Sequence, residues 1–206
     1  LDALKHIRSE FFPEWLKDLR ERTEKKLYTI GEYWSANIDT INNYIEKTNG
    51  CISLFDVPLH YNFYRASISN GEYNMSQIFE GTIVGTNPEK AITFVDNHDT
   101  EIGQGLESWI SDWFKPLAYA LILLRKDGFP CVFYGDYFGI PEKGISTKNE
   151  MLETLLKVRK YFAYGEQYDY FYDKNKIGFT RLGDSSHPDS GLAVVMSDGD
   201  GGSIQM

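Results

Sequence analysis

The sequence predicts an α/β fold in which a parallel sheet is followed by a smaller antiparallel sheet. Short apolar runs alternate with segments of helical spacing about four times before residue 165, a pattern typical of βα units. The apolar run at 91–95 leads into NHDT at 97–100, and a parallel sheet presents polar groups at such strand ends. After residue 165, short alternating runs are separated by turns rich in Asp, Gly and Ser. We therefore expect two domains, residues 1–165 and 166–206.

The first elements are expected to be a helix, a strand and a second helix. Apolar positions 11, 12, 15, 16 and 19 have helical spacing within 9–22, with Ser9 as a candidate N-cap and Pro13 allowing a later first turn. Strand formers follow at 27–30. Ile38, Ile41 and Ile45 then mark an amphipathic helix that ends near residue 50.

The remaining elements continue this alternation and then change character. We expect strands at 51–55, 91–95 and 130–134, and helices at 58–67, 113–126 and 147–161. Short strands at 168–172, 176–182 and 191–196 begin the antiparallel part.

Composition limits the class of protein. With 206 residues, 42% hydrophobic and 25% charged, the chain is ordinary for a globular protein with a real core. A formal net charge of -9 argues against a nucleic-acid partner, because phosphate binding needs a basic face. Cys51 and Cys131 are expected to be buried free thiols rather than a disulfide. There is no apolar run of membrane-spanning length. Because the sequence starts at Leu1-Asp2, we expect a segment of a longer protein.

Three carboxylates follow apparent strands: Asp2, Glu32 and Asp99. Singly, an Asp at a strand end is most often a turn or capping residue, and His98-Asp99 could be a structural pair. Glu32 precedes two aromatic residues that would shield it from water, and such burial raises a carboxyl pKa and suits a general acid. Taken together, these residues supply the two carboxyl groups that glycoside hydrolysis requires. The sequence contains no Gly-rich phosphate loop and no nucleophile elbow, the motifs that would indicate phosphoryl or acyl transfer instead.

Three segments of this sequence resemble the second, third and fourth signature regions of the α-amylases in glycoside hydrolase family thirteen. They are LDALKHI at 1–7, GEYW at 31–34 and FVDNHD at 94–99. The intervening sequence resembles the liquefying bacterial branch and its cytoplasmic relatives at 54–63, 113–120, 132–136 and 183–186. The resemblance implies the second half of a (β/α)8 TIM barrel, followed by the start of an antiparallel β-sandwich.

The resemblance also implies the roles of the three carboxylates. Asp2 matches the nucleophile that forms the glycosyl-enzyme, and Glu32 matches the general acid/base. Asp99 matches a third carboxylate that hydrogen-bonds sugar hydroxyls and helps to distort the ring. Because the family retains anomeric configuration, Asp2 and Glu32 should lie about 5–5.5 Å apart.

Substrate and calcium contacts are implied by the same matches. Lys5 and His6 match contacts on the leaving-group side, Trp34 lines that side, and His98 donates to the sugar. The backbone carbonyl at His6 commonly joins a Ca2+ shell whose other ligands lie outside this sequence. In the calcium-rich relatives a second ion lies between barrel and sandwich, and the resemblance implies its place near Gly71, Tyr73 and Asp169.

The expected function is endo-acting hydrolysis of internal α-1,4 bonds in starch, glycogen or maltodextrin. A transglycosylase or maltogenic enzyme remains open, because water and an acceptor sugar compete for one intermediate. A non-catalytic carbohydrate-binding protein is less favoured, because all three carboxylates are present. We expect residues 1–206 alone to be inactive, since half a barrel leaves strand edges unpaired. A monomer without a membrane partner is expected, in the cytoplasm or, alternatively, secreted.

Overall fold

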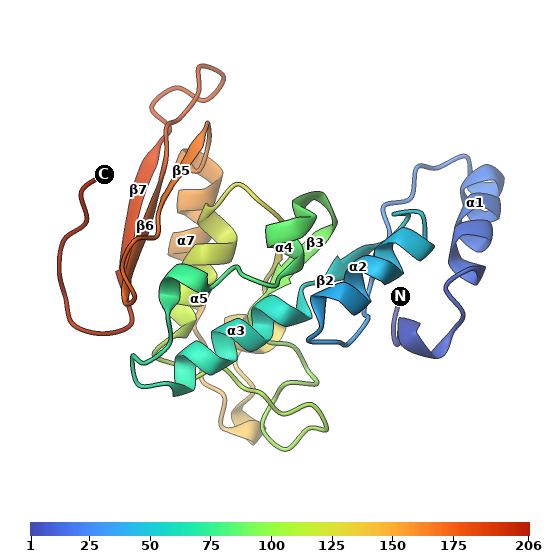
Figure 1. Ribbon diagram of the computed structural model, residues 1–206, viewed down its shortest axis with the longest axis horizontal. Coiled ribbons are helices and arrows are strands. Elements are labelled where there is room, and N and C mark those ends of the chain that lie inside the picture. Colours follow the sequence, from blue (N-terminus) through green and yellow to red (C-terminus); the bar gives the residue numbers. More distant parts are fainter.

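The computed structural model describes residues 1–206 and contains two separate sheets with helices around the first (Figure 1). The α-helices are α1 (Phe11–Thr23), α2 (Ile38–Lys47), α3 (Val57–Ile68), α4 (Ile83–Thr86), α5 (Lys115–Leu124), α6 (Tyr134–Phe138) and α7 (Asn149–Phe162). The strands are β1 (Ile30–Gly31), β2 (Ser53–Phe55), β3 (Ala91–Phe94), β4 (Phe129–Cys131), β5 (Gln167–Tyr170), β6 (Lys176–Arg181) and β7 (Leu192–Ser197). Single 3-10 turns are η1 (Leu4–His6), η2 (Met75–Gln77), η3 (Pro88–Lys90) and η4 (Pro141–Lys143).

The first sheet is parallel and its strand order follows the chain. Its order is β1-β2-β3-β4, with Ile30 opposite Ser53, Leu54 opposite Ala91 and Ile92 opposite Phe129. Sequential parallel strands joined by helical connections form the arc of a (β/α)8 barrel. The predicted fold class, a partial barrel followed by antiparallel strands, is confirmed.

Side chains at the helix starts explain where the connecting helices begin. Asn37 caps α2 by accepting a hydrogen bond from the Thr40 N–H. Asp56 caps α3 through the Leu59 N–H, and Pro58 fits the first turn, where no N–H partner is needed. Each cap contributes about 1 kcal/mol. The caps place α2 and α3 directly before and after β2.

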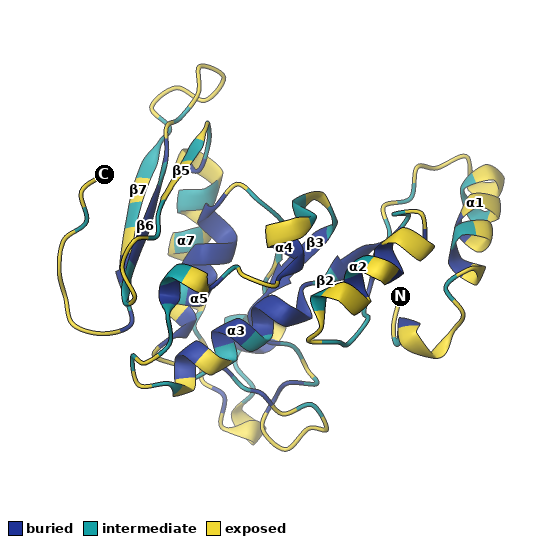
Figure 2. Ribbon diagram, viewed as in Figure 1, coloured by how far each residue is buried: buried dark blue, intermediate teal, exposed yellow.

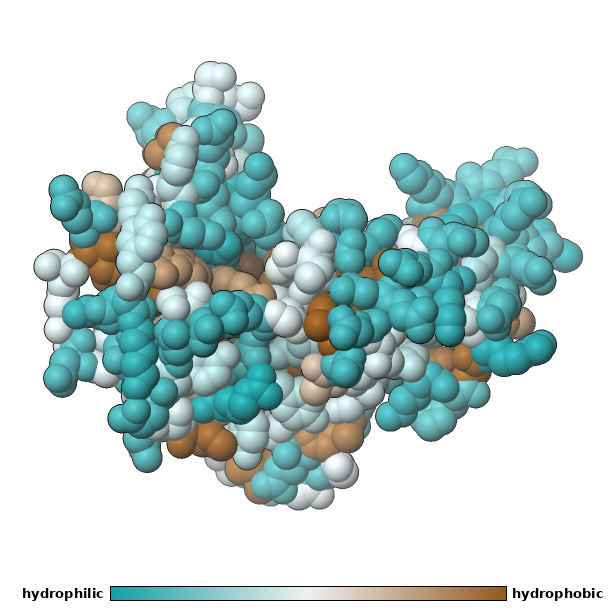
Figure 3. Space-filling view, in the orientation of Figure 1, coloured by the Kyte–Doolittle hydropathy of each residue, from teal (hydrophilic) through white to brown (hydrophobic).

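The core lies between the parallel sheet and the helices that follow it. Figure 2 shows α5 and much of α3 buried, whereas α1 is largely exposed. Phe63, Phe114 and Tyr119 are fully buried, and each such ring stabilises the fold by roughly 2 kcal/mol through removal from water. Figure 3 shows a mostly hydrophilic face with separate hydrophobic patches. No helix is both long and apolar enough to cross a membrane.

The antiparallel sheet β5-β6-β7 is attached to the first part by charged contacts. Arg125, directly after α5, donates to both carboxylate oxygens of Asp169 on β5, with Nη2 2.9 Å from Oδ2. Arg181 on β6 donates to the carbonyls of Leu124 and Gly165 at 3.2 and 3.1 Å. These arginines therefore also occupy the carbonyl end of α5, where positive charge is favourable.

Several predicted boundaries differ from the structure. Ser9 is not the N-cap of α1, because the helix begins at Phe11 after Glu10 without a side-chain cap. The expected strand at 130–134 ends at Cys131, and Tyr134 already begins α6. The cysteines are free, as predicted, but the prediction of burial is wrong. Cys51 is half-buried and Cys131 is exposed, because Cys131 lies on β4, the last strand of the parallel sheet.

Candidate active site

One cavity of about 260 Å³ lies at the carboxyl ends of the parallel strands and is lined by all three predicted carboxylates. The acidic residues and the histidine that line it lie before β1, at the end of β1 and just after β3. They are Asp2, Glu32, Asp96, His98 and Asp99. The carboxyl ends of parallel strands meet at one edge of a sheet, which explains why residues so distant in sequence share this cavity.

Asp2 and Glu32 are held side by side through backbone hydrogen bonds. Residues 1–4 run along β1, because the Glu32 N–H donates to the Leu1 carbonyl and the Leu4 N–H donates to the Glu32 carbonyl, both at 3.0 Å. The Ala3 N–H also donates to Oε2 of Glu32 at 2.9 Å. Ala3 has φ 50° and ψ 42°, a left-handed conformation that costs a non-glycine residue about 1–2 kcal/mol. Such strain is concentrated at functional sites.

Asp99 lies in a turn that its own neighbours fix. Oδ1 of Asn97 accepts hydrogen bonds from the N–H groups of Asp99 and Thr100 at 2.9 and 3.0 Å. The Asp99 side chain is 41% exposed and Oδ2 lies 3.6 Å from Nε2 of His98, whose side chain is 78% exposed. The backbone of this turn is therefore fixed while both side chains remain accessible to a ligand.

Aromatic residues form the floor behind these carboxylates. Phe94 packs edge-on against Phe55, with ring centroids 5.6 Å apart, and stacks on His60 at 5.3 Å. His60 is fully buried, with Nδ1 2.6 Å from the Val95 carbonyl and Nε2 2.8 Å from Oγ of Ser108. Burial lowers the pKa of His60 to about 4. His60 is therefore neutral at pH 7 and acts as a core residue.

Three residues expected to contact substrate are not among the residues that line this cavity. Lys5 lines a separate hollow beside Tyr33 and Lys47. His6 lies on the exposed turn η1. Trp34 donates its Nε1–H to the hydroxyl of Tyr61 at 3.1 Å. The structure therefore brings Asp2, Glu32, His98 and Asp99 together in this cavity. Lys5, His6 and Trp34 are not among its lining residues.

A buried charge network below the cavity was not anticipated from the sequence. Lys115, the first residue of α5, places Nζ 2.8 Å from Oδ2 of Asp96 and 2.6 Å from Oδ1 of Asp136, with all three side chains fully buried. Oδ2 of Asp136 accepts a hydrogen bond from the Tyr119 hydroxyl at 2.7 Å. Burial raises the pKa of Asp96 to about 6, although Lys115 opposes the shift. The one local signal that could have indicated this network is the position of Asp96, three residues before Asp99.

The residues present do not by themselves form a calcium site. No group of three or more His, Cys, Asp or Glu side chains is arranged to hold a metal, and one carbonyl at His6 is far short of the six to eight oxygens that Ca2+ takes. At the second expected position, the Gly71 carbonyl accepts from Nδ2 of Asn175 at 2.6 Å. Both oxygens of Asp169 accept hydrogen bonds from Arg125. One buried oxygen of Asp198 has no partner, but the same Asn175 amide occupies its other oxygen.

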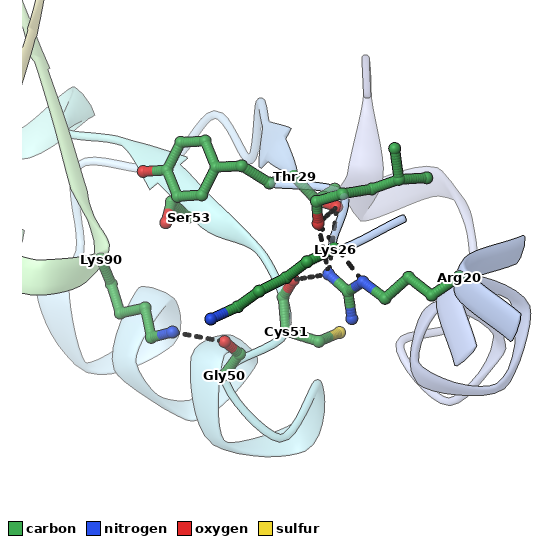
Figure 4. Close-up of a pocket in the computed structure, with 9 residues that line it drawn as sticks. Arg20, Lys26, Thr29, Gly50, Cys51, Ser53 and Lys90 are labelled. Carbon is green, nitrogen blue, oxygen red and sulfur yellow. Dashed lines mark hydrogen bonds between the residues drawn. The ribbon is translucent and has the colours of Figure 1, made fainter. Parts of the chain in front are cut away.

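A larger cavity of about 610 Å³ lies at the opposite, amino-terminal end of the strands (Figure 4). Two of the three cations that line it, Arg20 and Lys90, already have partners within the chain. Arg20 donates to the Leu27 carbonyl at 2.9 Å, and Lys90 donates to the Gly50 carbonyl at 2.5 Å. No carboxylate lines it. Active sites of this fold lie at the carboxyl ends of the strands, so the smaller cavity is the candidate site.

The half barrel, the antiparallel sheet and one cavity lined by three carboxylates match the arrangement expected of a TIM-barrel glycoside hydrolase. No family model matches the chain. It is 54% identical over 206 residues to an α-amylase of Geobacillus stearothermophilus, covering all of this chain and 38% of that protein. It is 42% identical over 212 residues to the cytoplasmic α-amylase of Escherichia coli, covering 98% of this chain and 42% of that protein.

A solved cyclomaltodextrin glucanotransferase is similar in fold. The TM-score is 0.69 at 20% identity, covering 96% of this chain and 43% of that structure. The chain is thus a homologue of the α-amylases of glycoside hydrolase family thirteen along its whole length. It spans about two fifths of the length of these relatives.

Proposed function

We propose that this chain is the carboxyl-terminal part of a retaining, endo-acting α-amylase that cleaves internal α-1,4 bonds of starch, glycogen or maltodextrin. The observation that supports this most strongly is the single cavity lined by Asp2, Glu32 and Asp99. Two carboxyl groups facing one glycosidic bond are the minimum for this reaction. The similarity to an α-amylase over all 206 residues supports the same substrate class.

In the proposed reaction, the Asp2 carboxylate attacks the anomeric carbon while the Glu32 carboxyl protonates the departing glycosidic oxygen. Water then attacks the anomeric carbon of the glycosyl-enzyme and the bond to Asp2 breaks, while the Glu32 carboxylate takes a proton from that water. The Asp2 carboxylate and the Glu32 carboxyl group are both restored. Because Oε2 of Glu32 already accepts from Ala3, Oε1 is the oxygen assigned to the transferred proton. This route predicts that the two carboxyl groups lie about 5–5.5 Å apart.

The remaining contacts are proposed around this pair. Asp99 is assigned hydrogen bonds to sugar hydroxyls, and His98 is assigned a donor role to the same sugar. Lys5 and His6 lie on η1, three and four residues after Asp2, which supports contacts on the leaving-group side. Trp34, fixed by Tyr61, is assigned to line that side.

The division of the chain into domains and the binding of a metal ion are also part of this proposal. Two separate sheets support a barrel part at 1–165 and the start of a β-sandwich at 166–206. A Ca2+ ion is proposed at the His6 carbonyl, with the other ligands supplied from outside this chain. Bound calcium would hold η1 in place and contribute nothing to proton transfer. Isothermal titration of the complete protein with Ca2+ tests this directly.

The cellular location and the oligomeric state are proposed as well. Two unpaired cysteines support a cytoplasmic location, and the cytoplasmic relative is consistent with it. The complete protein is proposed to be a monomer. Cell fractionation and light scattering of the complete protein measure both properties.

Product analysis of the complete protein tests the proposed function. Soluble starch should release reducing ends and a series of maltooligosaccharides, first appearing as the α-anomer by proton NMR. First products of β configuration would contradict the retaining mechanism. Added maltose should leave the hydrolysis rate nearly unchanged. If maltose were instead consumed to form longer products, the protein would be a transglycosylase. It would then resemble the solved glucanotransferase in its reaction as well as in its fold.

A further inference from the structure

The buried network around Lys115 is connected directly to the turn that carries Asp99. Oδ1 of Asp96 accepts a hydrogen bond from the Thr100 hydroxyl at 2.8 Å. The Thr100 oxygen in turn accepts from the Asn97 N–H at 3.0 Å. Since Oδ1 of Asn97 binds the Asp99 N–H, an unbroken chain of hydrogen bonds joins Lys115 to the backbone of Asp99.

Lys115 also connects this turn to the next strand end. Its Nζ contacts Asp136, which lies in α6, five residues after β4 ends at Cys131 and two residues after Tyr134. Tyr134 lines the same cavity as Asp99. The side chain of Lys115 therefore joins the ends of β3 and β4 at the level of the cavity floor.

Stability alone is a poor explanation for this arrangement. Two buried carboxylates share one ammonium group, and burying such charges costs several kcal/mol per ion before their attraction is counted. The network carries additional donors that fix its geometry: the Ile110 N–H lies 3.3 Å from Oδ2 of Asp96. The Trp109 ring lies over Nζ at 3.4 Å. Fully connected polar networks of this kind fix one arrangement of a backbone segment.

We propose that Lys115, Asp96 and Thr100 are positioning residues that hold the Asp99 turn in the geometry needed for α-glucan hydrolysis. No contact to the sugar is assigned to any of them, because all three are buried, although Asp96 also lines the cavity. They act by fixing the N–H groups and the backbone from which Asp99 projects. This inference rests on the proposed function, because it assigns a role to a residue of that site.

The hydroxyl of Thr100 offers the sharpest test, because a Lys115 variant would leave two unpaired buried carboxylates. Thr100→Val removes the link between Asp96 and the turn with little change in shape. Thr48→Val is the matched control. Thr48 is also fully buried, its hydroxyl donates to the Tyr44 and Ile45 carbonyls at 2.9 and 3.1 Å, and it lies just before β2 at the other end of the sheet. Thr100→Ser keeps the hydroxyl and should rescue the effect.

In the complete protein, Thr100→Val should lower kcat on soluble starch roughly tenfold or more, since small displacements of a catalytic group have large effects on rate. KM should stay within about threefold, because the contact strengthens in the transition state. Thr48→Val should lower the melting temperature by a similar amount and change kcat less than about twofold. An equal loss of kcat in both variants, or unchanged kcat in Thr100→Val, would overturn the proposal.

Amide hydrogen exchange separates this proposal from the function on which it rests. The N–H groups of Asp99 and Thr100 should exchange at least about tenfold faster in Thr100→Val and unchanged in Thr48→Val. If the unmodified protein released no reducing ends from starch, the proposed function would fail. Faster exchange confined to Thr100→Val would still support fixation of the turn, whereas equal exchange in both variants would overturn it.

Discussion

The Ala3 N–H donates a 2.9 Å hydrogen bond to Oε2 of Glu32. Ala3, the residue after Asp2, therefore orients the carboxylate of Glu32. Ala3 adopts φ 50° to do so, a conformation that few non-glycine residues tolerate. The cost of this backbone geometry, on the order of 1–2 kcal/mol, is met by the two flanking hydrogen bonds between residues 1–4 and Glu32. The pair is therefore fixed before any substrate arrives.

The first prediction concerns the stability contributed by Lys115. Lys115→Met in the complete protein should lower the free energy of unfolding by about 3–5 kcal/mol, because it leaves the Asp96 and Asp136 carboxylates buried without their cation. Urea denaturation followed by circular dichroism measures the change.

The control for that experiment is Lys157→Met on α7. The Lys157 side chain is 72% exposed and pairs with Glu153 at 3.8 Å, and such surface pairs contribute only about 0.5 kcal/mol. A loss at Lys115 no greater than at Lys157 would show that the buried pairing has no net effect on stability.

The second prediction concerns pH and His60. Burial lowers the pKa of His60 to about 4, below its ordinary value of about 6.5. Below pH 6.5 the unfolded chain therefore takes up a proton that the folded chain does not, and the free energy of unfolding falls as the pH decreases toward 4. The loss attributable to His60 between pH 7 and 4 should be on the order of 3 kcal/mol.

His60→Gln provides the comparison, because Gln keeps polar atoms in the site and does not titrate. The difference in unfolding free energy between the two proteins should shrink steadily from pH 7 to 4. Asp56 and Asp96 have pKa values raised to about 6 by burial and act with the opposite sign, but both proteins share them. Parallel curves across this range would mean that His60 is solvated in the folded state.

The third prediction concerns residues 1–206 as an isolated protein. In the structure, β4 has a neighbouring strand on one side only, and the outer edge of β1 is covered by residues 1–4 alone. Tyr28, Phe129 and Cys131, on or near these strands, are exposed. Unpaired edges with exposed aromatic rings favour association. Purified residues 1–206 should bind a hydrophobic dye, self-associate and release no reducing ends from starch. Measurable hydrolysis by a monomeric preparation would contradict this expectation.

The fold was largely predictable because its signals are local. The apolar run at 91–95 and the spacing of Ile38, Ile41 and Ile45 identify β3 and α2 without tertiary information. Strand lengths were less predictable. The β4 strand ends at Cys131 because parallel pairing with β3 extends only that far, and pairing depends on a distant segment.

The site was predictable only in part, for a physical reason. Glu32 and Asp99 follow β1 and β3, so their common edge could be inferred. Asp2 was expected there from the resemblance of LDALKHI to a signature region. Lys115 lies in the run WFKPLAYA, where a charged residue at a helix start ordinarily faces water. Its burial depends on Asp96 and Asp136, which lie 19 and 21 residues away, and no local pattern records such partners.

The most direct test of the proposed chemistry is Glu32→Gln in the complete protein. Gln keeps the size of the side chain and an oxygen to accept from the Ala3 N–H, but it has no proton to transfer. Glu46→Gln on the exposed side of α2 is the matched control. Starch hydrolysis should fall by about 10²–10⁴-fold in Glu32→Gln, with starch binding retained and the control unaffected. Hydrolysis at the unmodified rate would contradict the assignment of Glu32 as the acid and, with it, the account of this site.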